Sequence, residues 1–465
     1  MGKTVADALF QDPALDRAID ELVANVTTAG AKLGAGMAAD REPARELAKK
    51  INERRGRPLF FDGIIGSGLG RGPLVEMVDG SVKYDFIIAI GTNFFGHSDP
   101  DMLRTAVKAA LQDVAMQGNL HPNREYAAFM EALCSRAPGR LKRGWLAPSG
   151  ADANENALKI ARQKRNGAKI VIAFEHCFAG RTSAMAEITD QPGYRKGQPV
   201  FGQVLYVPFF DKADPAGSTA RAERVLREHI HRYGDQICAQ MFELVQGEGG
   251  FNSAPREFFE KLMRISRDAK LVIWVDEIQT FGRTRQLFAT QMLGLGDYVD
   301  ILTLGKLVQA AATLFVEEMT PDAGLLSGTF SSSTVSLALG RRVIERLSEE
   351  GHFGDDGKHA KLEKAALACI AKLAEGPCKG LISQPTAIGT MVSFIPFDGA
   401  ADTVNKVLRA AWERGVICFM AGHNPTKIRM LLPGGAITEA DLEAGIGLLG
   451  QAINDVAAQQ QKATG

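Results

Sequence analysis

Short apolar runs alternate with helical segments between about residues 95 and 330. The runs have the length of buried strands and read "RGWLAP", "KIVIAF", "VLYVPF", "CAQMFEL", "KLVIWVDE" and "DILTLGK". Strands that alternate with helices are typical of a mainly parallel sheet with helices on both faces. We therefore predict an α/β architecture for this part of the chain.

The pattern changes on both sides of this region. Residues 1–55 are charged and helical in pattern, and "VEMVDGSVKYDFIIAIG" predicts a hairpin that turns at Asp79-Gly80. Beyond residue 330 the pattern predicts a helix at 335–350 and strands at "MVSFIPF", "GVICFMAG" and "KIRMLLP". We expect three parts, which are an N-terminal segment at 1–60 that packs with the small domain, a large domain at 61–333, and a small α+β domain at 334–465.

Composition narrows the classes of function. The 465 residues include 54 Lys and Arg against 54 Asp and Glu, and this balance does not favour binding to nucleic acid or to an anionic membrane. No apolar stretch reaches the roughly 18 residues that span a bilayer, and the N-terminus has no apolar signal core. The six cysteines contain no CxxC pair, and the eight histidines form no metal-binding cluster. We expect a cytoplasmic protein without a metal site.

A glycine-rich run, "GSGLGRG" at 66–72, invites comparison with a dinucleotide-binding loop. Its spacing fails, because the positions that would need glycine are Arg71 and Pro73. We expect a flexible turn beside the active site instead.

Ligands bind open α/β sheets at the carboxyl ends of the strands, and several predicted strand ends carry polar residues. Ser149 begins "SGADANENALKIAR", in which Ser149 and Asp152 fit a capping box and the free N–H groups near Gly150 could hold an anion. An ordinary helix cap is the simpler interpretation of this segment taken alone. Phe178 and Arg181 follow the next strand, where local packing and solvation are the simpler interpretations.

The residues at two further strand ends indicate a functional site more specifically. Asp276 ends the strand "KLVIWVD", and a buried carboxylate needs a partner, either a structural arginine or the cation of a cofactor. Lys306 ends "DILTLGK"; partial desolvation lowers the pKa of a lysine, so that its free amine can attack a carbonyl. Gly305 would let the backbone approach a ligand.

These residues together match the needs of pyridoxal phosphate. That cofactor requires a lysine that forms a Schiff base, an acidic partner for its ring nitrogen and a site for its phosphate. Asp276 would keep the ring nitrogen protonated, and Lys306 would move the substrate proton as a general acid and base.

Several segments, in this order and spacing, resemble the class III, fold-type I pyridoxal-phosphate aminotransferases over roughly residues 60–450. They are "VDGSVKYDFIIAIGTNFFGHSDP", "SGADANENALKIAR", "FELVQGEGGFNSAPREFF", "VDEIQTFGRT", "TLGK" and "IRMLLPGGAITEADLE". The residue Gln309 and the stretch "ERGVICFMAG" are similar to the lysine ε-aminotransferase branch.

The resemblance implies a role for each site residue, with Lys306 as the Schiff-base lysine and Asp276 as the partner of the ring nitrogen. The other implied cofactor contacts are Ser149, Gly150 and Ala151 at the phosphate, Phe178 and Ile278 on the two faces of the ring, Gln279 near the ring hydroxyl, and Thr329 at the phosphate of the neighbouring subunit of a homodimer. The implied substrate contacts are Arg429 as the carboxylate clamp, Glu243 as the alternative partner of Arg429, and Arg181 as a second carboxylate contact.

The chain also departs from the family pattern. Ala151 replaces a usual Ser or Thr, Ala179 a usual His and Leu244 a usual Pro, while Ser331 to Ser333 stand where "GGNP" is common. The resemblance implies transfer of a terminal amino group, such as that of lysine, ornithine or 4-aminobutyrate, to 2-oxoglutarate by a ping-pong mechanism. A mutase, racemase or decarboxylase could use the same lysine and aspartate, and the altered loops would also suit a non-catalytic binding subunit.

Overall fold

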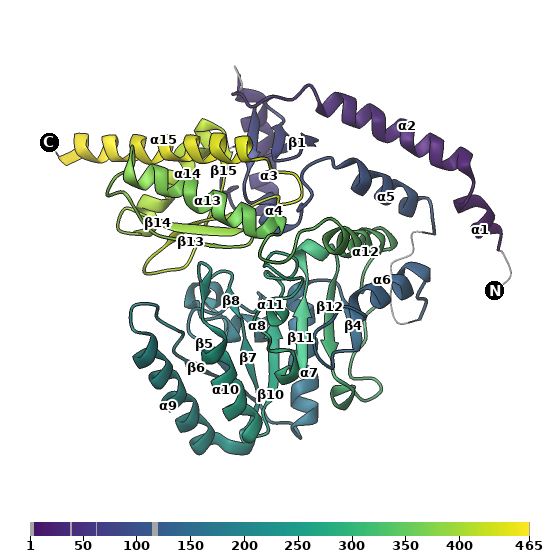
Figure 1. Ribbon diagram of the computed structural model, residues 1–465, viewed down its shortest axis with the longest axis vertical. Coiled ribbons are helices and arrows are strands. Elements are labelled where there is room, and N and C mark those ends of the chain that lie inside the picture. Colours follow the sequence, from purple (N-terminus) through teal and green to yellow (C-terminus); the bar gives the residue numbers. More distant parts are fainter. Residues whose placement is uncertain (1–3, 38–39, 62, 114–119, 465) are drawn as a thin grey trace. The chain divides into compact units, whose positions relative to one another are not determined.

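The computed structural model describes residues 4–37, 40–61, 63–113 and 120–464. It divides into two compact units, one formed by residues 1–112 and 361–465 and the other by residues 113–360 (Figure 1). This division differs from the predicted boundaries at 60 and 333. The predicted helix at 335–350 is α12 (Thr334–Glu349), and it packs against α6 (Arg124–Cys134) within the second unit.

The second unit is built on a seven-stranded sheet in the order β4-β12-β11-β10-β7-β5-β6. Its strands are β4 (Arg143–Ala147), β5 (Ile170–Phe174), β6 (Val204–Val207), β7 (Ile237–Phe242), β10 (Val272–Asp276), β11 (Ile301–Leu304) and β12 (Ala311–Phe315). All six predicted strands form, and the prediction of a mainly parallel sheet is confirmed. Only β12 runs antiparallel to its neighbours, β4 and β11.

Strand β12 was missed because its turn carries no usual turn residue. The chain reverses after β11 through the 3-10 turn η4 (Lys306–Val308), and Gln309 then adopts a left-handed conformation with φ of 60°. Glycine or asparagine is the expected residue at such a position, so the sequence "KLVQAAATLF" gives no signal of a hairpin.

Alternate residues of the strands face two different layers. Ala173, Met241 and Trp274 join the cluster that includes Ala157 and Leu158 of α7 (Gly150–Lys164). On the other face, the neighbouring Phe174 and Phe242 contact the ring of Phe259 in α10 (Arg256–Asp268). Helices therefore cover both faces of the sheet, as the continuous apolar runs predicted. Asp276 follows Trp274 by two residues, which places it on the face of α7.

Shorter elements complete this unit. They are α8 (Ser183–Ile188), α9 (Pro215–Tyr233), α11 (Ala289–Met292), the pair β8 (Val245–Gln246) and β9 (Asn252–Ser253), and the 3-10 turns η1 (Pro192–Arg195), η2 (Gly234–Gln236), η3 (Gly296–Tyr298) and η5 (Glu317–Met319).

The first unit contains two four-stranded sheets, in the orders β1-β2-β3-β15 and β13-β14-β17-β16. Their strands are β1 (Gly66–Arg71), β2 (Leu74–Met77), β3 (Val82–Asp85), β13 (Ile382–Ile388), β14 (Met391–Pro396), β15 (Val416–Ile417), β16 (Phe419–Ala421) and β17 (Lys427–Leu431). Its helices are α1 (Val5–Phe10), α2 (Pro13–Gly30), α3 (Glu42–Arg55), α4 (Ile88–Gly91), α5 (Pro100–Ala110), α13 (Lys358–Glu375), α14 (Ala401–Arg414) and α15 (Glu439–Thr464).

The predicted hairpin at Asp79-Gly80 is confirmed as β2 and β3, and Gly80 has φ of 79°. The prediction of a flexible turn at the glycine-rich run is wrong, because that run forms β1 and pairs with β2. Close packing explains Gly70 of this run, since a Cβ there would lie 2.3 Å from Cβ of His97.

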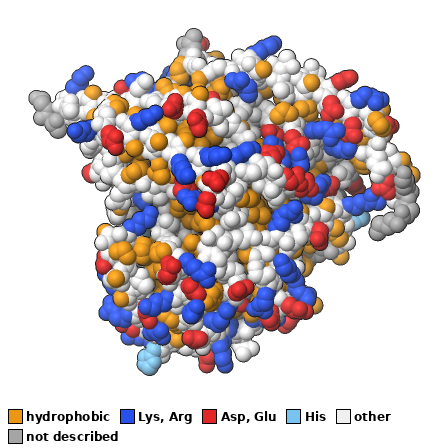
Figure 2. Space-filling view, viewed as in Figure 1, with side chains coloured by type: hydrophobic (Ala, Val, Ile, Leu, Met, Phe, Trp, Pro, Cys, Tyr) orange, Lys and Arg blue, Asp and Glu red, His pale blue; other side chains and the backbone are white. Residues whose placement is uncertain are grey.

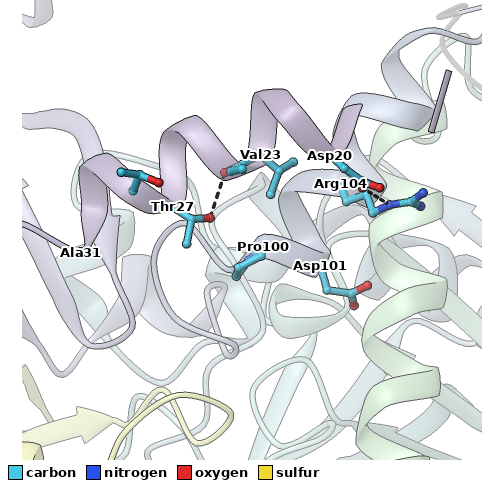
Figure 3. A pocket seen from close by; sticks show the side chains of 9 residues that line it. Asp20, Val23, Thr27, Ala31, Pro100, Asp101 and Arg104 are labelled. Carbon is cyan, nitrogen blue, oxygen red and sulfur yellow. Dashed lines mark hydrogen bonds and ion pairs between the residues drawn. The ribbon is translucent and has the colours of Figure 1, made fainter. Parts of the chain in front are cut away.

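Helices α2 and α5 lie side by side in the first unit and border a hollow of about 630 Å³ (Figure 3). Arg104 of α5 donates from Nε to Asp20 and from a terminal nitrogen to Asp16, both at 2.8 Å. On the face shown in Figure 2, acidic and basic side chains are interspersed, in keeping with the zero formal net charge. Among the described residues, no helix is both long enough and apolar enough to cross a membrane.

Glu277 anchors the segment that follows β10. Its side chain is fully buried, and its carboxylate accepts hydrogen bonds from the N–H groups of Ala289 at 2.7 Å and Thr290 at 2.8 Å, at the start of α11. The hydroxyl of Thr280 donates to it as well, at 3.1 Å. A buried acceptor with several donors keeps the end of β10, and thus Asp276, in a fixed place.

Replacement of this anchor should therefore cost stability. We expect Glu277→Ala to lower the free energy of unfolding by about 3 kcal/mol, because two buried N–H groups lose their acceptor. The matched control is Asp214→Ala, which removes an exposed cap of α9 at Gly217 and should cost about 1 kcal/mol. Urea unfolding of both variants measures the difference, and equal losses would contradict an anchoring role for Glu277.

Candidate active site

One cavity of about 280 Å³ lies at the carboxyl ends of the parallel strands in the second unit. Its lining residues are Ser149, Gly150, Ala151, Phe178, Ala179, Gly180, Arg181, Glu243, Val245, Glu248, Asp276, Ile278, Gln279, Thr280 and Lys306. All of the predicted site residues are among them except two. Thr329 is exposed in the loop before α12, and Arg429 lies buried on β17 of the first unit.

The backbone conformation of Lys306 distinguishes it from an ordinary lysine at a strand end. Strand β11 ends at Leu304, Gly305 is extended, and Lys306 has a left-handed φ of 52°. This conformation costs a residue with a side chain on the order of 1 kcal/mol, and such strain is concentrated at functional sites. The left-handed backbone directs the half-buried side chain of Lys306 into the cavity from the end of β11, which pairs with β10.

The N-terminus of α7 forms the anion-binding wall of the cavity. Ser149 is the N-cap, as predicted, and its hydroxyl accepts from the N–H of Asp152 and donates to the carboxylate of that residue. Within the described part of the chain, the N–H groups of Gly150 and Ala151 make no hydrogen bond. Free N–H groups at the positive end of a helix suit a phosphate.

Asp276 is 6% exposed, and among the described residues only neutral groups donate to its carboxylate. The N–H of Ile278 donates to Oδ1 at 2.8 Å, and Nδ2 of Asn154 donates to Oδ2 at 2.7 Å. Burial raises the pKa of Asp276 to about 6, although these two bonds and the charge of Lys306 act to lower it. A positively charged ring nitrogen would supply the charge that this buried carboxylate needs.

Glu243 is a second buried carboxylate in the same cavity. Its oxygens accept from the N–H of Phe178 at 2.8 Å and from the N–H of Gly247 at 3.1 Å. Burial, and then the nearby charge of Asp276, raise the pKa of Glu243 to about 8. Its predicted pairing with Arg429 stays a prediction.

Side chains from other segments hold the loop that carries Phe178. Thr189 accepts from the N–H of Ala179 at 2.9 Å, Asp190 from the N–H of His176 at 2.8 Å, and Asn154 donates to the carbonyl of Ala179 at 2.7 Å. Phe178 is therefore presented to the cavity on a fixed backbone.

The sequence analysis did not single out Asn154, Thr189 or Asp190. A signal existed for Asn154, which is a polar residue within the buried stripe of α7 that contains Ala153, Ala157 and Leu158.

Arg181 lies at an exposed part of the cavity lining. Its guanidinium carbon is 3.4 Å from the ring centroid of Tyr194 and 5.8 Å from that of Phe178. Stacking on aromatic rings holds a guanidinium by its face and leaves its edge for a carboxylate.

Two glycines make room for the residues that would border the cofactor ring. A Cβ at Gly150 would lie 2.9 Å from Cδ1 of Ile278, and a Cβ at Gly247 would lie 2.6 Å from Cδ of Gln279. Without side chains at 150 and 247, Ile278 and Gln279 can line the cavity.

This structure fits pyridoxal phosphate on the chemistry of its donor set. Free N–H groups of α7 suit the phosphate, the buried carboxylate of Asp276 suits a cationic ring nitrogen, and Lys306 offers an amine for the aldehyde. Phe178 and Ile278 offer apolar surface to the ring. The loss of a hydroxyl at Ala151 leaves the N–H groups of the helix terminus in place.

Comparisons with known proteins agree with this chemistry. Residues 68–453 match the family model of the class III aminotransferases. The chain is 30% identical to 2-aminoadipate transaminase of Pseudomonas putida over 408 residues, which cover 83% of this chain and 95% of that protein. It is 28% identical to 4-aminobutyrate aminotransferase of Mycobacterium leprae over 437 residues, which cover 88% of this chain and 95% of that protein.

Among solved structures, the fold is similar to that of lysine aminotransferase from Mycobacterium tuberculosis. The TM-score is 0.75 at 21% identity, over 88% of this chain and 99% of that one. The predicted fold type and the predicted cofactor are confirmed by these matches. The family model spans most of the chain, and the protein belongs to the class III aminotransferases, which are transaminases that depend on pyridoxal phosphate.

Proposed function

We propose that this transaminase moves a terminal amino group, such as that of lysine, ornithine or 4-aminobutyrate, to 2-oxoglutarate. The proposal rests first on the placement of Asp276 and Lys306 in one cavity. Strands β10 and β11 pair in parallel with Asp276 opposite Thr303, and Lys306 follows three residues later, so both groups reach the same edge of the sheet.

The choice of donor and acceptor rests on sequence. The name of the Mycobacterium leprae relative is that of a transaminase for a terminal amine, and the segments around Gln309 and before Arg429 are similar to the lysine ε-aminotransferase branch. The chain keeps both Glu243 and Arg429, the pair that would let one site accept substrates with one carboxylate or with two.

Each residue has a defined task in this proposal. Bound pyridoxal phosphate supplies an electron sink for the substrate carbon that loses its proton. Lys306 would hold the cofactor and carry that proton on Nζ, and Asp276 would hold the ring nitrogen. Phe178 and Ile278 would cover the ring and exclude water, Gln279 would bond near its hydroxyl, and Ser149, Gly150 and Ala151 would hold the phosphate.

We also propose a homodimer in which Thr329 reaches the phosphate of the neighbouring copy. The support is that Thr329 is exposed and that the adjacent Phe330 is 59% exposed, as expected for a segment that another chain covers. Sedimentation of the purified protein should give a dimer, and a fully active monomer would contradict this arrangement.

None of the six cysteines forms a disulfide, which supports a cytoplasmic location.

The first prediction for the reaction itself concerns Lys306. Borohydride reduction of the yellow protein, followed by peptide mapping, should find the cofactor attached to Lys306. Lys306→Ala should lose at least about a thousandfold in kcat, because both the attachment point and the proton carrier are gone. A label on another residue, or a colourless protein that ignores added cofactor, would instead favour a non-catalytic subunit.

The second prediction concerns the pH dependence of cofactor binding. Burial raises the pKa of Asp276 to about 6. Below that pH the carboxyl is protonated and must lose its proton to pair with a cationic ring nitrogen, so affinity falls as the pH falls. Loss of one proton on binding corresponds to at most about tenfold in affinity per pH unit.

Asp276→Asn is the control for other titrating groups, including the cofactor phosphate and Lys306. This variant should bind pyridoxal phosphate more weakly than the wild type at pH 7.5. Its affinity should also lack the pH dependence that comes from the carboxyl group of Asp276. Cofactor titrations between pH 5 and 8 measure both proteins, and parallel curves would rule out Asp276 as the ring-nitrogen partner.

The third prediction concerns the substrates. A panel of terminal amines with 2-oxoglutarate should yield glutamate with at least one donor. Arg429→Gln should raise the KM for 2-oxoglutarate about tenfold or more, since a charged bidentate contact is lost, and Arg429→Lys should raise it less. Turnover without any oxo acid would indicate a mutase or a racemase, and release of carbon dioxide would indicate a decarboxylase.

A further inference from the structure

Asn154 occupies an unusual place for a polar side chain. It lies near the start of α7, is completely buried, and interrupts a stripe of small apolar residues. An alanine or leucine would continue this stripe without a polar group to satisfy. A fully buried amide in such a stripe therefore calls for a reason beyond packing.

The hydrogen bonds of Asn154 give that reason. Its Nδ2 donates to Oδ2 of Asp276 and to the carbonyl of Ala179, each at 2.7 Å. Because both neighbours are acceptors, only the NH2 end of the amide can face them, which fixes its orientation. The carbonyl end, Oδ1, is buried and has no hydrogen-bond partner in the described part of the chain. The two hydrogen bonds of the NH2 group thus offset the cost of leaving this oxygen unsatisfied.

The partners of Asp276 leave its charge available. In the part of the chain that the structure describes, both of its hydrogen-bond donors, Asn154 and the N–H of Ile278, are neutral. The described titratable groups around it are Lys306, Glu243 and Cys177, of which only Lys306 can carry a positive charge. An arginine in place of Asn154 would neutralise the carboxylate, whereas an amide orients it and keeps it anionic.

We propose that Asn154 is a positioning residue for the ring nitrogen of the cofactor. It fixes one oxygen of Asp276 and, through the carbonyl of Ala179, ties that carboxylate to the loop that carries Phe178. Asn154 therefore supports both Asp276, which would pair with the ring nitrogen, and the loop of Phe178, which would cover the ring. This inference rests on the proposed role of Asp276.

The test compares two ligands of the cofactor-free protein. Pyridoxal phosphate has the ring nitrogen, and 1-deazapyridoxal phosphate has carbon in its place. Asn154→Leu keeps the branching and the number of heavy atoms of the side chain and removes the donors, and Asn154→Ser is a smaller second variant for the case that the first does not fold. Thr189→Val is the matched control, because Thr189 supports the same loop at the N–H of Ala179 and is not bonded to Asp276.

The wild type should prefer the cofactor over the deaza analogue. The Asn154 variants should lose about tenfold or more in affinity for pyridoxal phosphate and less than about twofold for the analogue, as expected for weakened binding to a charged partner. Thr189→Val should keep the wild-type preference.

Other results would overturn the proposal. An equal loss for both ligands would assign Asn154 to loop structure alone, and an unchanged preference in both variants would remove it from the site. A wild type that binds both ligands equally would overturn the role of Asp276 and that of Asn154 together. A preference that is present in the wild type, absent in Asp276→Asn and intact in the Asn154 variants would overturn only the Asn154 proposal.

Discussion

The site depends on a buried carboxylate for which the described residues supply no matching buried cation. Asp276 ends β10 on the face of α7 and, within the described ranges, receives hydrogen bonds only from neutral donors. Desolvation disfavours its charge, and the only described positive group whose charge acts on it is Lys306. Such a carboxylate is costly in the cofactor-free protein and valuable once a cationic ring nitrogen is present, which is the general pattern of a preorganised binding site.

The surrounding structure keeps this carboxylate from relaxing. Glu277, the next residue, is fastened to the start of α11, so the end of β10 cannot move toward solvent. Asn154 of α7 holds the carboxylate of Asp276 through a hydrogen bond to Oδ2. The left-handed backbone of Lys306 places its amine at the same edge of the sheet, next to the free N–H groups of α7. Backbone strain at Lys306 and desolvation of Asp276 both raise the free energy of the folded protein. The packed α/β core, in which strands are buried on two faces, offsets these costs.

Glycines at 150 and 247 show how closely the walls of the cavity are packed. Side chains there would collide with Ile278 and Gln279. Two of the departures of this chain from the family pattern lie in the cavity lining, at Ala151 and Ala179, where a smaller side chain removes a group but leaves the backbone contacts in place. The N–H and carbonyl of Ala179 remain bonded to Thr189 and Asn154, so the loss of the usual histidine does not release the loop.

The sequence by itself determined the mainly parallel sheet, six of its seven strands, the cofactor and most of the residues that line the cavity. Apolar runs report burial directly, and the carboxyl ends of parallel strands meet at one edge, so Asp276 and Lys306 could be brought together from their positions alone. Tertiary structure alone decided the rest. Strand β12 follows a left-handed Gln309, Gly70 of β1 leaves room for the side chain of His97, and the bond from Asn154 to Asp276 joins residues 122 positions apart. Such features arise from which backbones and side chains meet after folding, and a local pattern along the chain does not carry that information.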